Sequence, residues 1–447
     1  MAGGDNPMAH PEIERLEREE MLALQGQKLA ALGHRLSGHP EWEAHCATAG
    51  LKPADLADPQ ALSAAPTMAK ADLRERYPFP LLTVEMTAVE RFCATSGTTG
   101  PPVMFGFTPT DLDVLLAGQM VRAMTAAGLR PGDRVYQGHG YGLWLGGLGM
   151  DVGLRALGAT NFPLGPGRGE VAVEWLRDMA YTACIMSPLW LARLAAIAGE
   201  RGINPKRDWH LRVGLFGGQA VSTAYRDEIE AAMPPGFLAQ NLYGSTEAGG
   251  PCVAVSCPHS HDIDQMHLIN EDTILTEVLQ PETLRPVAPG EVGELVVTTL
   301  EKQASPVVRW RTGDLVRLKE RPFDCPCGRR GLPLIGRIIG RSDDMLKIRG
   351  VIVYPSQVED VVAGTPGAAN DAWQIYLHQQ GPALEEATVA IELSLSAPMD
   401  AATLEKTVAA SLRDRLGLRV AVECHEPGTL PRYEGKAQRV LPYPGGD

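Results

Sequence analysis

The sequence predicts an α/β fold with a large N-terminal domain of parallel and mixed sheets, flanking helices, an antiparallel subdomain, and a small C-terminal α+β domain. After residue 103, short apolar segments alternate with helical ones, as in a mostly parallel sheet covered by helices. From Thr273, apolar and polar residues alternate between Pro and Gly turns, which is typical of antiparallel strands. At 447 residues the chain is too long for one core.

Helical spacing of apolar residues predicts a first helix from Pro11 to Arg35. The segments that follow are assigned by the same periodicities: helices at 111–127, in GLGMDVGLRALGA, at 170–179 and at 189–198, and strands at 134–136, 184–186 and 212–216. After Gly340, MLKIRGVIVYPSQVEDVV predicts a strand and then a helix that starts at Pro355. Asp400 caps a further helix. We expect a domain over 1–341, with its antiparallel subdomain at about 270–335, and a second domain over 342–447.

Composition narrows the class of protein. The chain has 41 basic and 54 acidic residues and a net charge of −13, which argues against nucleic-acid binding and against a polybasic membrane anchor. The first twenty residues are acidic and contain no apolar run, so we expect no export signal. The most apolar stretch, 181–199, contains Pro188 and Arg193 and is better explained as a strand and a helix than as a membrane span. We therefore expect a soluble, cytoplasmic protein.

Five short motifs carry chemical information, although each has an ordinary alternative. Residues 93–103, CATSGTTGPPV, offer backbone N–H groups and hydroxyls to phosphate oxygens, or form a flexible turn, and they lack the lysine of a Walker loop. Residues 241–247, NLYGSTE, combine a ring, hydroxyls and a carboxylate, or end a strand with a capping box. The other three motifs are WRTGD at 310–314, GRSDDMLKIRG at 340–350 and GKAQR at 435–439.

The order and spacing of these motifs resemble the adenylate-forming superfamily of acyl-CoA synthetases, luciferases and adenylation domains. GLRPGDRV, GYGLWLGGLG, SDDMLKIRGVIVYPSQVE and GKAQRV are most similar to phenylacetate–coenzyme A ligases. The resemblance covers the chain from about residue 70. It implies that ATP and Mg²⁺ convert a carboxylic acid to an acyl-adenylate and pyrophosphate, and that coenzyme A then displaces AMP.

The resemblance also implies a role for individual residues. Lys436 bridges the carboxylate and the α-phosphate, Thr246 touches the α-phosphate, and Glu247 holds Mg²⁺. Asp343 is the hinge about which the small domain, a mobile lid, rotates between the two half-reactions. The nucleotide is held by residues from several motifs: Ser96, Thr98 and Thr99 at the phosphates; Tyr243, Gly217, Gly218 and Gln219 at adenine; Asp314 and Arg341 at the ribose; and Asn241, Gly244 and Ser245 as further binding residues.

The resemblance also implies that a set of aromatic residues lines the acid pocket, and aromatic rings suit a flat acid such as an aryl acid. They are Tyr136, His139, Tyr141, Trp144, Trp190 and Phe216. Packing in the core is the alternative for about half of them.

Cysteines and histidines predict a structural zinc site. Cys257, Cys325 and Cys327 are the expected thiolates, and His259 or His261 completes the set, with His267 beyond. Reduced thiols and solvated histidines are the alternative.

Two positions depart from the family pattern: Pro101 stands where the phosphate loop commonly has lysine, and Gln219 where a Gly-Glu/Ala pair is common. We expect weakened ATP binding with the chemistry kept. Besides a CoA ligase, two hypotheses stay open: an adenylating ligase whose acceptor is an amine or a separate carrier protein, and a non-catalytic nucleotide-binding relative. A homodimer stays open as the assembly.

Overall fold

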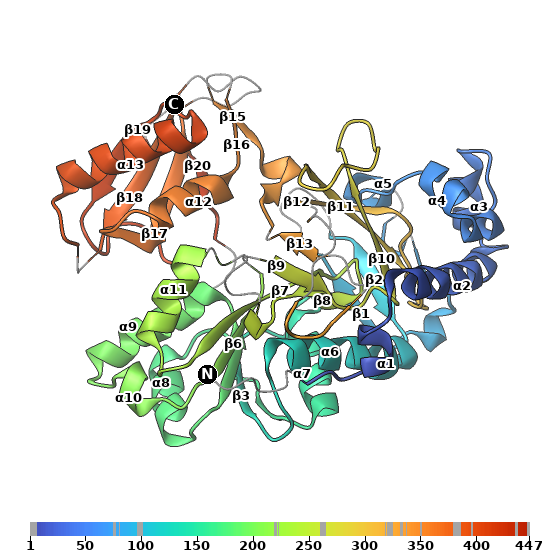
Figure 1. The fold of residues 1–447 in the computed structure, drawn as a ribbon, viewed down its shortest axis with the longest axis horizontal. Helices are drawn as coiled ribbons and strands as arrows, with labels where there is room; N and C mark the ends of the chain where they lie inside the picture. Colours follow the sequence, from blue (N-terminus) through green and yellow to red (C-terminus); the bar gives the residue numbers. More distant parts are fainter. Residues whose placement is uncertain are drawn as a thin grey trace.

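The computed structural model describes residues 7–74, 77–79, 81–95, 102–218, 221, 223–259, 265–317, 319, 325–330, 334–336, 338–348, 351–378, 386–394, 397–433 and 437–444. Figure 1 shows a large body and a smaller C-terminal domain beside it. Among the described residues, no helix is both long and apolar enough to cross a membrane.

The N-terminal segment is helical but broken. The single helix expected from Pro11 to Arg35 was wrong, because the chain ends α1 at Glu14 and restarts as α2 at Arg18, where Glu17 and Glu20 form a reciprocal cap. The short elements of this segment are α1 (Pro11–Glu14), α2 (Arg18–Leu36), α3 (Pro40–Ala47), η1 (Pro53–Ala57), α4 (Pro59–Ala64), α5 (Lys70–Arg74) and η2 (Met86–Ala88).

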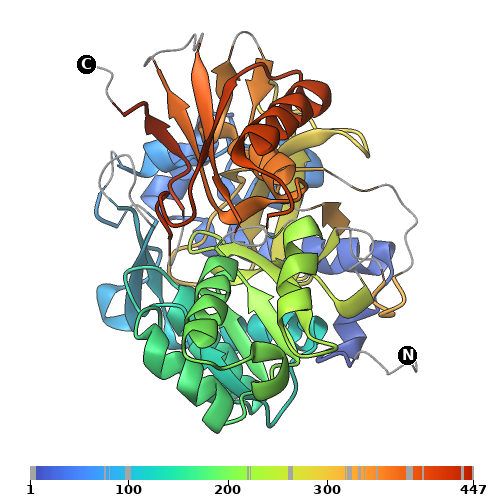
Figure 2. The same cartoon turned by 90° about the vertical axis from the view of Figure 1, so that its left-hand side faces the viewer.

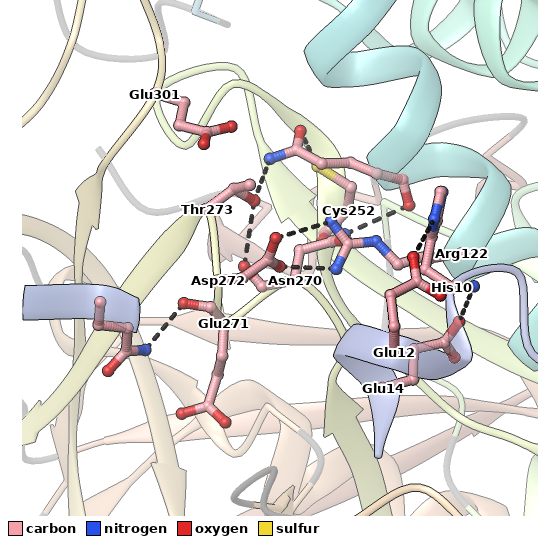
Figure 3. A network of polar contacts seen from close by, with 12 residues as sticks. His10, Glu12, Glu14, Arg122, Cys252, Asn270, Glu271, Asp272, Thr273 and Glu301 are labelled. Atoms are coloured by element: carbon pink, nitrogen blue, oxygen red, sulfur yellow. Dashed lines mark hydrogen bonds and ion pairs between the residues drawn. The ribbon is translucent and has the colours of Figure 1, made fainter. Parts of the chain in front are cut away.

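A polar network fixes this segment against the rest of the large body (Figure 3). Arg122 donates to both carboxylate oxygens of Asp272 at 2.6 and 3.3 Å, and both side chains are buried. Gln25, on α2, donates to the backbone carbonyl of Glu271 at 2.8 Å. Since breaking such a buried pair leaves an uncompensated charge, the pair holds α6 (Ala117–Ala127) against the turn at 270–273. The bond of Gln25 attaches α2 to the same turn.

The central sheet has eight strands in the order β13-β9-β8-β7-β6-β5-β3-β4. Its parallel half is β3 (Arg134–Gln137), β4 (Thr160–Phe162), β5 (Ala183–Met186), β6 (Val213–Phe216) and β7 (Leu238–Ser245). Its antiparallel half adds β8 (Gly250–Val255), β9 (Gln265–Leu268) and β13 (Leu334–Gly336). The helices that connect these strands are α6 (Ala117–Ala127), α7 (Gly146–Leu157), α8 (Gly169–Asp178), α9 (Pro188–Glu200), α10 (Pro205–Asp208) and α11 (Thr223–Ala232).

Two antiparallel units complete the large body. A four-stranded sheet runs β10 (Ile274–Leu279), β11 (Val292–Thr299), β12 (Trp310–Arg317) and β14 (Gly340–Arg341). A hairpin pairs β1 (Arg91–Ala94) with β2 (Met104–Phe107), and the π-helix η3 (Asp111–Leu116) follows it. The loop of this hairpin is therefore the Ser/Thr/Gly segment singled out in the sequence.

The C-terminal domain has its own core and lies against α11 (Figures 1 and 2). Its four-stranded sheet has the order β19-β18-β17-β20. As the sequence predicts, Asp400 caps a helix, α13, by accepting from the backbone N–H of Thr403 at 2.8 Å. The elements are η5 (Ser342–Asp344), β15 (Leu346–Ile348), β16 (Val351–Val353), α12 (Pro355–Ala363), β17 (Ala368–Leu377), β18 (Ala387–Leu393), α13 (Ala401–Leu416), β19 (Ala421–His425) and β20 (Val440–Pro442).

Candidate active site

Three residues from three separate motifs meet at the edge of the large body. The phenol of Tyr243 donates to Oδ2 of Asp314 at 2.6 Å, and Nη1 of Arg341 donates to Oδ1 of the same carboxylate at 3.0 Å. Burial, and then the adjacent Asp314 carboxylate, raise the pKa of Tyr243 well above its ordinary value, so the phenol stays protonated and remains a donor. The structure thus joins the expected adenine and ribose residues into one corner.

Strand pairing explains why this corner forms. Asp314 on β12 lies directly opposite Arg341 on β14. β12 is irregular at Gly313, directly before Asp314: the φ of Gly313 is +77°, and a Cβ there would lie 2.8 Å from Nη2 of Arg341. Thr312 donates through Oγ1 to the carbonyl of Leu295 at 2.7 Å, which anchors this irregular segment to β11. Glycine at position 313 therefore suits both the backbone conformation and the approach of Arg341 to Asp314.

The NLYGSTE motif ends β7, next to this corner. Asn241 is fixed by its side chain, which accepts from the backbone N–H of Val221 at 3.1 Å. Thr246 is buried and accepts from the backbone N–H of Leu145 at 3.4 Å. In the described part of the chain no hydrogen bond reaches the Glu247 carboxylate, which leaves its oxygens available to a cation.

The phosphate loop joins β1 to β2, and its base is fixed. The backbone N–H of Thr95 donates to the carbonyl of Val103 at 3.0 Å, and the N–H of Val103 returns a bond to Oγ1 of Thr95 at 3.3 Å. The expected phosphate ligands within the loop, and further positions singled out in the sequence, lie outside the described residues: Ser96, Thr98, Thr99, Pro101, Gln219 and Lys436. Their roles stay predictions.

Half of the expected acid-pocket residues lie in the core. Tyr136 and Trp190 are each 2% exposed and bond to each other, the indole N–H donating to the phenol oxygen at 2.9 Å. The phenol of Tyr136 in turn donates to the carbonyl of Gly165 at 3.0 Å, and Phe216 is fully buried in the same cluster. These side chains support the pocket region by packing, and a direct contact with the acid stays a prediction.

The other expected pocket residues are His139, Tyr141 and Trp144. His139 is 7% exposed, and within the part of the chain that the structure describes its Nε2 has no hydrogen-bond partner. Its ring meets that of Trp144 edge-on at 5.6 Å between centroids, and Nε2 lies 3.8 Å from where a Cβ on Gly217 would stand. Burial lowers the pKa of His139 to about 4, so the ring is neutral at pH 7. Tyr141 and Trp144 are 47% and 41% exposed, so this wall of the region is open to solvent.

The expected hinge lies where the two domains join. Asp343 belongs to η5, between β14 of the large body and β15 of the small domain. A short turn at a domain junction can absorb the backbone rotation that moves a lid. The position therefore suits a hinge, and the motion itself stays a prediction.

Three thiols and one imidazole form a compact, buried cluster. The ligand atoms of Cys257, His267, Cys325 and Cys327 all lie within 4.8 Å of one another. Sγ of Cys257 is 3.6 Å from Sγ of Cys325, and Sγ of Cys327 is 3.5 Å from Nε2 of His267. Burial acts to lower the pKa of His267, but the hydrogen bonds of Cys257 and Cys327 raise it to about 9. Three sulfur atoms and one nitrogen at this spacing are a ligand set typical of tetrahedral zinc.

Within the described residues, the histidine that joins this cluster is His267 and not the expected His259. His259 follows Cys257 by only two residues and its side chain is exposed, while His261 lies outside the described residues. His267 joins the thiols because it sits on β9, opposite Val255 of β8 and opposite Leu334 of β13. The pairing of β9 with β8 was the missing signal, since a period-2 reading of QMHL alone does not reveal its neighbours.

The chain has two α/β domains, and the motifs expected to bind ribose, adenine and a cation converge at the carboxyl end of a parallel strand. This arrangement is that of an adenylate-forming enzyme. Family models agree: residues 54–300 match "AMP-binding enzyme", and residues 350–443 match "AMP-binding enzyme C-terminal domain". The chain belongs to this family of AMP-binding enzymes.

Relatives extend over almost the whole chain. The phenylacetate-coenzyme A ligase of Thermus thermophilus is 36% identical over 452 residues, covering 97% of this chain and 99% of its own. That of Escherichia coli (strain K12) is 36% identical over 434 residues, covering 96% of each chain.

Solved structures also indicate which arrangement of the domains is present. A crystal structure of 2-hydroxyisobutyryl-CoA ligase in the postadenylation state has a TM-score of 0.88 and 28% identity, covering 97% of this chain and 91% of the other. The same ligase in the thioesterification state has a TM-score of only 0.69 over the same coverage. The arrangement of the two domains in this chain is therefore closer to that of the first structure than to that of the second.

Proposed function

We propose that this chain activates a carboxylic acid with ATP and transfers it to coenzyme A. In the first half-reaction an oxygen of the acid attacks the α-phosphorus and the bond to pyrophosphate breaks. In the second, the thiol sulfur of coenzyme A forms a bond to the acyl carbon, AMP leaves, and the thiol proton is released. The identity of 34–36% to phenylacetate-coenzyme A ligases over nearly the whole chain supports coenzyme A as the acceptor over an amine or a carrier protein.

The single observation that carries the proposal is the Tyr243–Asp314–Arg341 corner. A carboxylate that faces the site can accept from both ribose hydroxyls, while the ring of Tyr243 offers an apolar face to adenine. Both the acyl-adenylate and ATP carry this nucleoside, so one corner serves both half-reactions. Gly217 and Gly218 would border the opposite face of the base.

Charge neutralisation is the main chemical task, because a carboxylate must approach a polyanion. Glu247 would hold Mg²⁺, and the bound ion would neutralise negative charge on the phosphates. Thr246 would donate to the α-phosphate, and Lys436 would approach from the small domain to bridge the two reactants. Ser96, Thr98 and Thr99 would hold the departing pyrophosphate.

The acid is proposed to be an aryl acid, of the phenylacetate or benzoate kind. Support comes from the rings around the neutral His139, which Trp144 meets edge-on. The cysteine cluster is proposed to hold one structural zinc ion through Cys257, His267, Cys325 and Cys327, tying the end of β8 to the chain before β13. A soluble, cytoplasmic enzyme fits the reduced thiols of all eight cysteines.

A two-stage assay tests the function. A panel of aryl and aliphatic acids is screened for acid-dependent pyrophosphate release with MgATP, and coenzyme A is then added while AMP is measured. We expect one group of aryl acids to release pyrophosphate, and AMP to follow only when the thiol is present. If pyrophosphate is released but AMP follows only when an amine, and not coenzyme A, is added, the acceptor is an amine and not coenzyme A. No release with any acid would contradict the proposal.

A further inference from the structure

One lysine in the interior of the large body has no hydrogen-bond partner among the residues that the structure describes. Lys302 is 1% exposed, and its Nζ makes no hydrogen bond to any of them. An ammonium has three donors and loses its hydration on burial, so an unbonded one is destabilising unless other groups compensate. The sequence offers no sign of this, since EKQAS at 301–305 is an ordinary polar turn.

The first compensating groups are aromatic and lie beneath the phosphate loop. Nζ of Lys302 lies 4.3 Å from the ring centroid of Phe107 and 4.9 Å from that of Phe105. Both rings belong to β2, the strand that leaves the loop, and Phe105 pairs with Cys93 on the strand that enters it. The charge therefore rests against the base of the hairpin, held by cation–π attraction.

Two carboxylates also attract this ammonium, Asp111 first and Glu247 second. The oxygens of Asp111 are already used: Oδ1 accepts from the backbone N–H of Gln303 at 2.7 Å, and Oδ2 accepts from that of Ala304 at 3.0 Å. Asp111 thus fixes the backbone that carries Lys302. Glu247, whose carboxylate has no hydrogen bond within the described chain, is the acid toward which the charge can act.

The stem of the lysine touches the turn that follows Glu247. Cδ of Lys302 lies 3.8 Å from where a Cβ on Gly249 would stand, and Gly249 has a φ of +95°. The same turn lines a cavity of about 10 Å³ beside Lys302, room for about one water molecule. One side chain therefore contacts both the hairpin of the phosphate loop and the turn of the Mg²⁺ carboxylate.

We propose that Lys302 is a positioning residue for the ATP half-reaction, a buried charge that holds Glu247 and the phosphate hairpin in register for MgATP. The proposal rests on the proposed function of this site. Burial lowers the pKa of Lys302 to about 8, which leaves the ammonium the main form at neutral pH. If the lysine were purely structural, an apolar side chain of the same length could replace it without loss of function. Such a replacement removes both the charge and the cost of burying it, and its effect on protein stability is often neutral or favourable.

The test uses Lys302→Met in the full chain, with Lys206→Met as the matched control, since Lys206 lies at an exposed position of α10. Calorimetry gives the affinity for MgATP and for metal-free ATP, and single turnover gives each half-reaction. We expect about a tenfold loss of MgATP affinity, a smaller loss for metal-free ATP, an unchanged or higher Tm, and thioester formation from supplied acyl-adenylate within about twofold of wild type. Glu247→Gln should largely abolish the effect of Lys302→Met, because either change removes the attraction between the two charges.

Equal MgATP affinity in Lys302→Met and wild type would overturn the proposal, as would equal loss of both half-reactions or strict additivity with Glu247→Gln. If Lys302→Met does not fold, Lys302→Gln repeats the measurement, and failure of both neutral variants to fold would assign the lysine to structure alone. A wild-type chain that does not bind MgATP would overturn the proposed function itself. Failure of the Lys302 proposal can therefore be distinguished from failure of the proposed function.

Discussion

Arg341 donates to Asp314 at 3.0 Å across the β12–β14 pair, and this contact joins two motifs that are 27 residues apart in the chain. It completes the corner that Tyr243 begins. The strand β14 is the last of the large body before η5, so the nucleotide contact and the domain junction are adjacent in sequence. If Asp314 and Arg341 bind the nucleoside as proposed, one short segment links the nucleotide site to the domain junction.

Replacing Asp314 by asparagine tests this corner. Asp314→Asn keeps the shape but removes the charge that holds Tyr243 and Arg341, so we expect KM for ATP to rise by roughly 10- to 100-fold. Both half-reactions should fall, because both bind the nucleoside. Asp113→Asn, which alters an exposed pair with Arg155, is the control and should change neither. An effect confined to adenylation would contradict the assignment.

Lys436→Ala, unlike Asp314→Asn, should impair one half-reaction and spare the other. We expect adenylate formation to fall by about 100-fold or more, because the charge that bridges carboxylate and α-phosphate is lost. Thioester formation from a supplied acyl-adenylate should stay within about threefold of wild type, because the lid has by then moved. Lys406→Ala, at an exposed position of α13, is the control. Parallel loss of both steps would disprove the role of Lys436.

The metal content distinguishes His267 from His259. We expect about one zinc per chain, lost in His267→Asn and in Cys325→Ser and retained in His259→Asn, because only the first two remove a member of the buried cluster. Elemental analysis of the purified proteins measures the content, and Tm with and without a chelator shows whether the ion is structural. A metal-free native chain would end the zinc proposal, and loss in His259→Asn alone would restore the sequence-based assignment.

The buried imidazole of His139 should make stability pH-dependent. Its pKa is lowered from 6.5 to about 4, so below pH 6.5 the unfolded chain binds a proton that the folded chain does not. Its contribution is complete above pH 6.5 and is lost as the pH falls toward 4, amounting to about 2 kcal/mol between pH 7.5 and 5. Urea unfolding at both values should show a correspondingly smaller drop for His139→Phe. Equal drops would show that the imidazole titrates normally.

A contact between the domains should favour the observed arrangement. Asn370 of the small domain donates to Glu228 of α11. We expect Glu228→Ala to slow adenylation by about two- to fivefold without slowing the thioester step, since an exposed contact contributes at most about 1 kcal/mol. Single-turnover rates measure both steps, with the exposed Glu200→Ala as control. A slower thioester step would indicate that the contact serves the other state.

The sequence alone determined the class of fold and singled out the motifs from which the candidate site is built. The order of the motifs, the change of periodicity after Thr273 and the cap at Asp400 are local signals, encoded in residues that neighbour one another in the chain. The N-terminal helix was misjudged because the reciprocal cap of Glu17 and Glu20 starts a new helix inside a continuous apolar pattern.

The tertiary structure decided which residues meet. His267 replaces His259 in the cysteine cluster because β9 pairs with both β8 and β13, and Tyr136 turns into the core because Trp190 satisfies its hydroxyl. Lys302 acquires its surroundings from β2, η3 and the turn after β7. Such contacts depend on strand pairing and burial between distant segments, and neither leaves a periodic signal in the local sequence.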